Sequence, residues 1–369
     1  MAGNRSASRG ISSESVRYST RATRACNLGM AALLLVSAMV VTSCRKKSTQ
    51  PSKLVTLKVG HLPVTGHAKF FVAKEEKFFE QEGLDVQLTE FTNSADGLAA
   101  LRAGQLDLGA FGTTAPLVHI AKGAELRIIG GVMGEDASII TTKEKAVGVK
   151  SVADLKGKKV ATVRLATGDA VLRGALAKVG LDWKKDLEIF EVKNPPAVIE
   201  AVKSGQVDAG VVWGPHDLRA EEQGLVVVVR SKDLSPGHPC CRLTINQKDL
   251  ESRGDLWEHF IRAILKAERF SKTNQEVTIR DIVKYVKIDP AMAQKAFYSP
   301  YLDQTSDPNL AGIQDFWKTM KTSNFVESTA EIAPFVDGKN YLAALDSLAK
   351  EEPQEAYWKT LRSVYSSRN

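Results

Sequence analysis

Cysteine and long hydrophobic runs are both scarce in this chain. Its 369 residues include four cysteines, and two of them, Cys240 and Cys241, are neighbours. Neighbouring Cα atoms lie about 3.8 Å apart, whereas disulfides usually join Cα atoms about 4.4–6.8 Å apart. Because Cys26 and Cys44 belong to the amino-terminal export segment described below, we expect a fold without a disulfide framework. The longest apolar segment, Leu28–Val41, would form a helix of about 21 Å, too short for a bilayer core of about 30 Å.

A strong charge of one sign is also missing from most of the chain. The formal net charge is +7, but +4 of it comes from five arginines and Glu14 within residues 1–43, which leaves +3 for the rest. This small surplus does not form the basic stripe of a nucleic-acid-binding protein, so we expect no nucleic-acid partner. The sequence also lacks a P-loop, a GxSxG elbow, an HExxH motif and a dinucleotide fingerprint. We expect no enzymatic activity and no cofactor.

The amino terminus has the pattern of an export signal. An arginine-rich, acid-poor segment precedes the apolar run Leu28–Val41, as in a signal peptide. The run ends in Val41-Thr42-Ser43-Cys44, which resembles the lipobox of bacterial lipoproteins and implies cleavage before a lipid-carrying Cys44. We therefore expect a signal peptide over residues 1–43, a tether over 44–53, and a palmitate-bearing protein anchored outside the cytoplasm. The alternative is an ordinary signal peptide with a chance cysteine.

An internal repeat indicates two similar lobes. Residues 100–112 read ALRAGQLDLGAFG and residues 201–213 read AVKSGQVDAGVVW. In each copy a glycine ends a helix, and the chain turns into a short apolar strand. Strands and helices alternate around both copies, which is typical of open parallel sheets covered by helices. The sequence therefore predicts an α/β fold with two lobes.

Hydrophobic periodicity gives the approximate positions of the elements. Strands are expected at residues 55–59, 84–91, 107–111, 126–130, 159–163, 187–192, 208–212 and 225–229. Helices are expected at residues 68–81, 95–103, 116–122, 170–179, 196–203 and 216–223, and the chain from residue 256 is expected to be helical to its end.

Four segments, in order, resemble one protein family. They are VGHLPVTGHAKFFVAKEEKFFEQEGLDVQLTEF, GQLDLGAFG, SVADLKGKKVA and SGQVDAGVVW. With the lipobox, they are similar to the nitrate, sulfonate, taurine and bicarbonate group of periplasmic binding proteins, which also includes thiamine-pyrimidine binders. The resemblance implies a type II two-lobed fold with two crossovers, near residues 143–149 and 235–239. Lobe one would comprise residues 54–145 and 239–369, and lobe two residues 146–238.

The same resemblance implies a function. We expect a monomeric solute-binding lipoprotein that captures a small anionic or zwitterionic solute between its lobes. It would deliver the solute to the permease and ATPase subunits of an ABC importer. Two alternatives stay open at this point. An enzyme related to thiamine-pyrimidine synthesis shares the fold, although the export signal argues against it, and a binding protein of this kind could instead present its ligand to a membrane sensor.

The ligand site is expected at the carboxyl ends of the strands, where loops lead into helices. Helix amino termini there expose N–H groups that favour an oxyanion. Some of the polar residues at these ends have a second interpretation, since hydroxyls can cap helices, Arg164 can form a surface salt bridge and Trp213 can fill a core. The candidate ligand-binding residues are Gly66, His67, Ser94, Gly112, Thr113, Thr114, Arg164, Thr167, Gly168, Trp213, His216, Cys240 and Cys241.

The cysteine pair and the histidines raise the question of a metal. Cys240 and Cys241 either pack as small hydrophobic residues or line the cleft beside an apolar part of the ligand. The spacing of the cysteines and of the histidines in the same loops matches no metal-binding motif, so we expect no metal site. The histidines concerned are His61, His67, His216 and His238.

Overall fold

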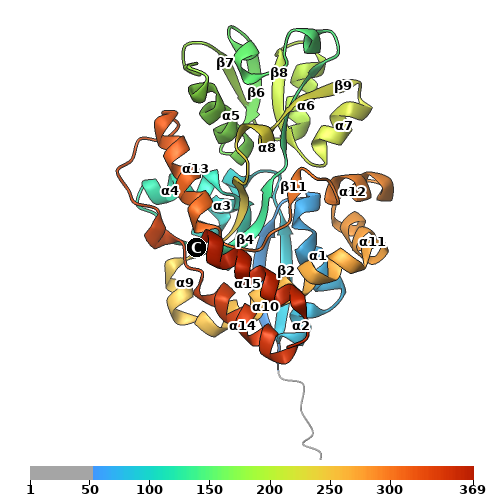
Figure 1. Ribbon diagram of the computed structural model, residues 1–369, viewed down its shortest axis with the longest axis vertical. Helices are drawn as coiled ribbons and strands as arrows, with labels where there is room; N and C mark the ends of the chain where they lie inside the picture. Colours follow the sequence, from blue (N-terminus) through green and yellow to red (C-terminus); the bar gives the residue numbers. More distant parts are fainter. Residues whose placement is uncertain (1–52) are drawn as a thin grey trace, which may run out of the picture. The chain divides into compact units, whose positions relative to one another are not determined.

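The computed structural model describes residues 53–369, which form two α/β lobes (Figure 1). The predicted signal peptide, most of the predicted tether and the predicted lipidation site Cys44 lie outside the described residues. Each lobe is built on one sheet, with the strand orders β11-β4-β10-β3-β1-β2 and β7-β6-β8-β5-β9. Within residues 53–369, no helix combines the length and the apolar character needed to cross a membrane.

Lobe one consists of two stretches of the chain. The first contains β1 (Val55–His61), a 3-10 turn (Thr65–His67), α1 (Ala68–Glu75), α2 (Phe78–Gln81), β2 (Leu84–Glu90), α3 (Ser94–Arg102), β3 (Leu108–Gly112), α4 (Thr114–Ala121) and β4 (Leu126–Glu135). The second contains β10 (Pro239–Asn246), α9 (Gln247–Ser252), α10 (Gly254–Thr273), α11 (Gln275–Tyr285), α12 (Pro290–Phe297), β11 (Leu302–Asp303), α13 (Leu310–Thr322), a 3-10 turn (Ala333–Phe335), α14 (Lys339–Glu351) and α15 (Ala356–Arg368).

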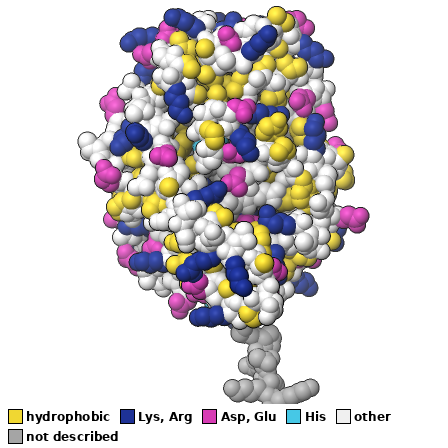
Figure 2. Space-filling view, viewed as in Figure 1, with side chains coloured by type: hydrophobic (Ala, Val, Ile, Leu, Met, Phe, Trp, Pro, Cys, Tyr) yellow, Lys and Arg dark blue, Asp and Glu magenta, His cyan; other side chains and the backbone are white. Residues whose placement is uncertain are grey.

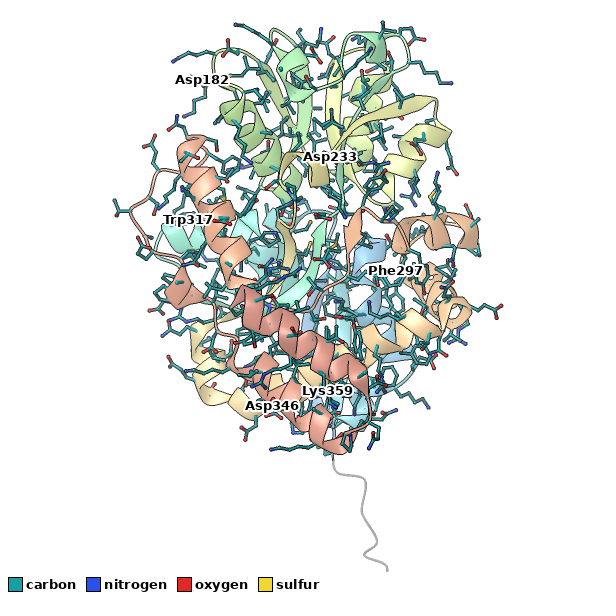
Figure 3. The ribbon with its side chains drawn as sticks, viewed as in Figure 1. Asp182, Asp233, Phe297, Trp317, Asp346 and Lys359 are labelled. Carbon is teal, nitrogen blue, oxygen red and sulfur yellow. The ribbon has the colours of Figure 1, made fainter. Side chains whose placement is uncertain are left out.

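Lobe two is one continuous stretch. It contains β5 (Ala137–Thr142), 3-10 turns at Lys145–Val147 and Val152–Leu155, β6 (Lys159–Val163), α5 (Thr167–Lys178), β7 (Glu188–Val192), α6 (Pro195–Lys203), β8 (Ala209–Trp213), α7 (His216–Glu222) and β9 (Leu225–Arg230). Helix α8 (Ser231–Leu234) follows and leads back toward lobe one. Asp233 on α8 lies between the lobes, whereas Asp182 and Asp346 lie toward opposite ends (Figure 3).

The first crossover lies earlier than predicted. Residues 137–145 were assigned to lobe one, but β5 pairs antiparallel with β8 and β9 in the second sheet, which places the crossover at Glu135 and Asp136. The physical reason is long-range pairing, since the partners of β5 come some 70 residues later and leave no local signal. The second crossover, between β9 and β10, falls around the predicted residues 235–239.

The strand that follows each crossover runs against its neighbours. Strand β10 is antiparallel to β3 and β4, and β5 is antiparallel to β8 and β9, whereas β1, β2 and β3 are parallel, as are β6, β7 and β8. A chain that arrives from the other lobe enters the sheet from the edge where the parallel strands end. The fold is therefore the expected two-lobed α/β architecture. One interior strand is reversed in each sheet, and the edge strand β11 of the first sheet also runs antiparallel to β4.

The sequence repeat has the same structural role in both lobes. Asp107 accepts a hydrogen bond from the Lys58 backbone N–H at 2.7 Å, and Asp208 accepts one from the Lys159 backbone N–H at 2.8 Å. Each aspartate thus joins one strand, β1 or β6, to the turn that precedes its neighbour in the sheet, β3 or β8. The preceding glycines, Gly104 and Gly205, have φ of +72° and +75°, a conformation that other residues adopt only with strain.

The predicted helix 68–81 is divided in the structure. Helix α1 ends at Glu75 and α2 begins at Phe78, because Lys77 between them is left-handed with φ of +60°. Phe70 and Phe71 of α1 and Phe79 of α2 are nonetheless all buried in the core of lobe one, which Trp257 and Phe260 of α10 complete.

The lobes also touch outside the sheets. Helix α13 of lobe one packs against α5 of lobe two, and a Cβ on Gly174 would lie 2.2 Å from the Thr319 side chain. On the face shown in Figure 2, basic and acidic side chains are interspersed, and no basic stripe is visible there.

Candidate functional site

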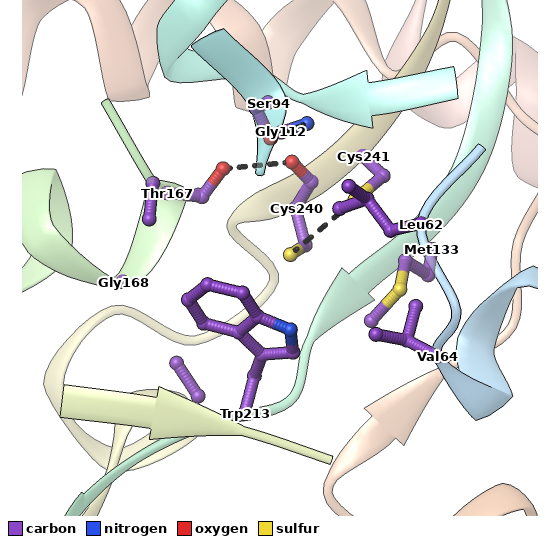
Figure 4. Close-up of a pocket in the computed structure, with 12 residues that line it drawn as sticks. Leu62, Val64, Ser94, Gly112, Met133, Thr167, Gly168, Trp213, Cys240 and Cys241 are labelled. Atoms are coloured by element: carbon purple, nitrogen blue, oxygen red, sulfur yellow. Dashed lines mark hydrogen bonds between the residues drawn. The ribbon is translucent and has the colours of Figure 1, made fainter. Parts of the chain in front are cut away.

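A small cavity lies between the lobes, where the carboxyl ends of parallel strands from both sheets meet (Figure 4). Its volume is about 20 Å³, room for about one water molecule. Seven of the thirteen candidate residues line it: Ser94, Gly112, Thr167, Gly168, Trp213, Cys240 and Cys241.

Two helices begin at the cavity. Ser94 is the first residue of α3 and Thr167 the first of α5, so the positive ends of both helix dipoles lie beside the same space. Ser94 Oγ accepts a hydrogen bond from the Gly112 N–H at 3.0 Å, and the preceding Asn93 caps α3 by accepting from the Asp96 N–H. The hydroxyl of Ser94 is therefore held by the end of β3 rather than used as the cap.

The carbonyl oxygen of Cys240 joins the two lobes. It accepts hydrogen bonds from the hydroxyl and the N–H of Thr113, at 2.9 and 2.6 Å, and from the hydroxyl of Thr167, at 2.8 Å. Thr113 and Cys240 belong to lobe one, whereas Thr167 belongs to lobe two. A Cβ on Gly112 would lie 3.0 Å from Thr167 Oγ1, so the lobes approach each other closely at this point.

The two thiols of the cysteine pair lie 3.9 Å apart. Their hydrogen bond lowers the pKa of Cys240, while the same bond, together with burial, raises the pKa of Cys241 well above its usual value. Both side chains line the cavity, while Cys241 also belongs to the hydrophobic core of lobe one and Cys240 packs against it.

A buried arginine supports this wall of the cavity. Arg242 is fully buried, and its Nη1 donates to the carbonyl oxygens of Met133 at 3.1 Å and Cys241 at 2.8 Å. Burial lowers the pKa of Arg242 to about 10, so the guanidinium stays charged at neutral pH. Within residues 53–369, its Nε and Nη2 have no hydrogen-bond partner.

The other six candidate residues do not line the cavity in this structure. Thr113 binds Cys240, Thr114 is buried with its hydroxyl unpaired within the described residues, and Arg164 is exposed. His67 Nδ1 accepts a hydrogen bond from the Leu62 N–H at 3.2 Å, so His67 positions a lining residue. Gly66 and His216 lie close to other lining residues. A Cβ on Gly66 would lie 2.3 Å from Met133 Sδ, and the ring of His216 lies edge-on to Trp213.

Sequence reasoning missed most of the apolar part of the cavity wall. Val64 and Ala166 lie in loops where the ligand was expected, whereas Leu62, Met133 and Ala137 were not expected there. The predicted strand 126–130 was too short to include Met133. Strand β4 continues to Glu135 and carries Met133 to the cavity. The lining includes no charged side chain, and no group of three His, Cys, Asp or Glu in the described part of the chain is placed to hold a metal ion.

A second cavity lies beside the first crossover and is lined by charged side chains. Asp136, Asp217, Arg230 and Tyr301 contribute to its wall. Asp217 forms an ion pair with Arg230, whereas Asp136 has no basic side chain within 4.0 Å among residues 53–369. Burial raises the pKa of Asp136 well above its usual value, and the nearby Asp217 raises it further.

Two lobes, two crossovers and a cavity at the strand ends define a periplasmic-binding-protein fold. Solved structures support this assignment. The periplasmic nitrate-binding protein of Synechocystis matches with a TM-score of 0.70 at 15% identity, over 80% of this chain and 89% of that one. The alkanesulfonate-binding protein of Xanthomonas axonopodis matches with a TM-score of 0.66 at 21% identity, over 77% and 98%.

Residues 50–287 match the NMT1-like family, and the chain belongs to that family. A binding protein of Brucella abortus is 30% identical over 60% of this chain and 68% of its own length. The taurine-binding periplasmic protein of Escherichia coli is 23% identical over 56% of this chain and 63% of its own length. The expected resemblance to sulfonate-, taurine- and nitrate-binding proteins is therefore confirmed.

Proposed function

We propose that this chain is the solute-binding lipoprotein of an ABC importer and holds its solute between the two lobes. The observation that carries this proposal is the cavity at the strand ends, whose wall comes from both lobes. Lobes joined by two crossovers can close around a ligand by hinge bending. The solute would then pass to permease and ATPase subunits, as expected for a binding protein of this class.

The chemistry of the cavity favours a small anionic or zwitterionic solute with an apolar part. The amino termini of α3 and α5 present N–H groups that suit an oxyanion. Trp213, Met133 and Leu62 provide apolar surface on the opposite side. Since the cavity in this structure holds about one water molecule, the lobes must separate before the solute can enter.

A thermal-shift screen tests the proposal. Nitrate, bicarbonate, taurine, aliphatic sulfonates and aminopyrimidines would each be added to the purified protein. A solute at 100 times its Kd stabilises the folded protein by about 2.7 kcal/mol. Trp213→Ala should abolish the shift, whereas Phe190→Ala, on β7 and outside the cavity, should retain it. A shift that survives Trp213→Ala would place the solute elsewhere.

The lipid anchor needs a separate experiment. The motif Val41-Thr42-Ser43-Cys44 supports attachment of lipid to Cys44. Cys44→Ala should abolish incorporation of labelled palmitate and release the protein from membranes, whereas Cys26→Ala should change neither. Equal labelling of Cys44→Ala and the unsubstituted protein would contradict lipidation at this residue.

A further inference from the structure

Three sulfur atoms belong to the wall of the cavity between the lobes. They are the thiols of Cys240 and Cys241 and the thioether of Met133 (Figure 4). The two thiol sulfurs lie 3.9 Å apart. Because the described lining contains no carboxylate and no imidazole, these sulfurs are the donors there with the highest affinity for a metal ion.

The separation of the thiols allows both of them to bind one metal ion. Thiolate–metal bonds are about 2.3 Å long, so two sulfurs 3.9 Å apart on one ion subtend an angle of about 120°. An angle of this size leaves room for a third donor. Thiolates also bind zinc, but zinc prefers four tetrahedral ligands, whereas two thiolates with one thioether suit Cu(I).

We propose that this cavity binds one Cu(I) ion through the Cys240 and Cys241 thiolates and the Met133 thioether. On binding, each thiol releases its proton to solvent and forms a bond to copper. Copper arrives as Cu(I) and stays Cu(I), so no oxidant or reductant is required. The third donor is a methionine, which explains why no cluster of His, Cys, Asp and Glu marks the site within residues 53–369.

Neighbouring residues hold the backbone that carries the three sulfurs. Arg242 donates to the carbonyl oxygens of both Met133 and Cys241, and its positive charge offsets the negative charge of a dithiolate–Cu(I) complex. Thr113 and Thr167 hold the carbonyl oxygen of Cys240. Such supporting contacts fix the positions of metal ligands. This site shares the cavity with the proposed solute but does not depend on the importer function.

Copper competition tests the site directly. The full-length chain carrying Cys26→Ser and Cys44→Ser, kept in detergent without oxygen, would be titrated with Cu(I) against bathocuproine disulfonate. One equivalent should bind. Cys240→Ser and Cys241→Ser should each weaken binding about a hundredfold or more, and Met133→Leu about tenfold. Met292→Leu, a methionine outside the cavity, is the matched control and should have no effect.

X-ray absorption on the chain with both cleft cysteines present provides a second measurement that does not depend on how those variants fold. Three sulfur neighbours at about 2.3 Å are expected. The proposal is overturned if this chain cannot hold Cu(I) against the competitor. It is also overturned if Cys240→Ser/Cys241→Ser retains the ion, if the spectrum lacks a third sulfur, or if Zn(II) displaces Cu(I) at equal concentration.

Discussion

Thr113 and Thr167 donate their hydroxyls to the same acceptor, the carbonyl oxygen of Cys240, although they belong to different lobes. The Thr113 bond lies within lobe one, and the Thr167 bond connects lobe two to lobe one. Substitutions of the two threonines can therefore be compared to distinguish a loss of stability within lobe one from a loss of closure between the lobes.

Removing the Thr167 hydroxyl should open the protein. We expect Thr167→Ala to increase the radius of gyration in small-angle scattering, whereas Thr113→Ala should leave it unchanged. Each substitution removes one hydrogen bond and should cost about 1 kcal/mol in the free energy of unfolding. Equal scattering curves for the two variants would contradict a closing role for Thr167.

Gly112 allows the lobes to meet. A Cβ at this position would lie 3.0 Å from Thr167 Oγ1 and 3.1 Å from Ser94 Oγ, so Gly112→Ala should hold the lobes apart and weaken solute binding about tenfold or more. Gly254→Ala is the control, because a Cβ there meets no heavy atom within 4 Å. Calorimetry with a solute from the screen measures the effect, and unchanged affinity in Gly112→Ala would argue against contact of the lobes at this glycine.

His216 makes stability depend on pH. Burial, with the nearby charge of Arg219, lowers the pKa of His216 from 6.5 to about 3. Between these values the unfolded chain binds a proton that the folded chain does not, so stability falls as the pH decreases from 6.5 toward 3. The slope from this group is about 1.4 kcal/mol per pH unit.

His216→Gln should remove this contribution. Urea unfolding between about pH 6.5 and 4 should then show a shallower loss of stability than in the unsubstituted protein. Above about pH 8 the two slopes should coincide, which serves as the internal control. Identical slopes throughout the acid range would show that this histidine is protonated in the folded protein.

The two aspartates of the charged cavity should respond oppositely to substitution. Burial and the nearby Asp217 raise the pKa of Asp136 well above its usual value. The carboxyl group therefore resists ionisation in the folded protein, and stability falls as the pH rises from the usual pKa of an aspartate toward the raised one. Asp136→Asn removes this loss and should leave stability at pH 7 equal or higher.

Asp217→Asn is the matched control in the same cavity. Asp217 is paired with Arg230 and also accepts a hydrogen bond from the Leu218 N–H at 2.8 Å. Losing a charged acceptor should cost about 1.5–3 kcal/mol, measured by denaturant unfolding at pH 7. A comparable loss in Asp136→Asn would show that Asp136 is ionised and paired in solution.

Local patterns predicted much of the architecture. The alternation of strands and helices and the repeat around Asp107 and Asp208 correctly indicated two related α/β lobes, because hydrophobic periodicity and turn chemistry act over short distances. Strands β5 and β10 had no such signal. Each is inserted between strands that are distant in sequence, so its place depends on long-range pairing.

Some features of the cavity could likewise be predicted from the sequence, and others could not. The sequence by itself placed glycines, hydroxyls and Trp213 at strand ends, where parallel sheets collect their loops, and the cysteine pair where the chain re-enters lobe one. Only the tertiary structure decided that Thr167 of one lobe meets Cys240 of the other, that Met133 lines the same cavity as the two cysteines, and that Arg164 stays outside. These outcomes depend on how the two lobes close and on how far β4 extends, and neither is encoded in any short segment of the chain.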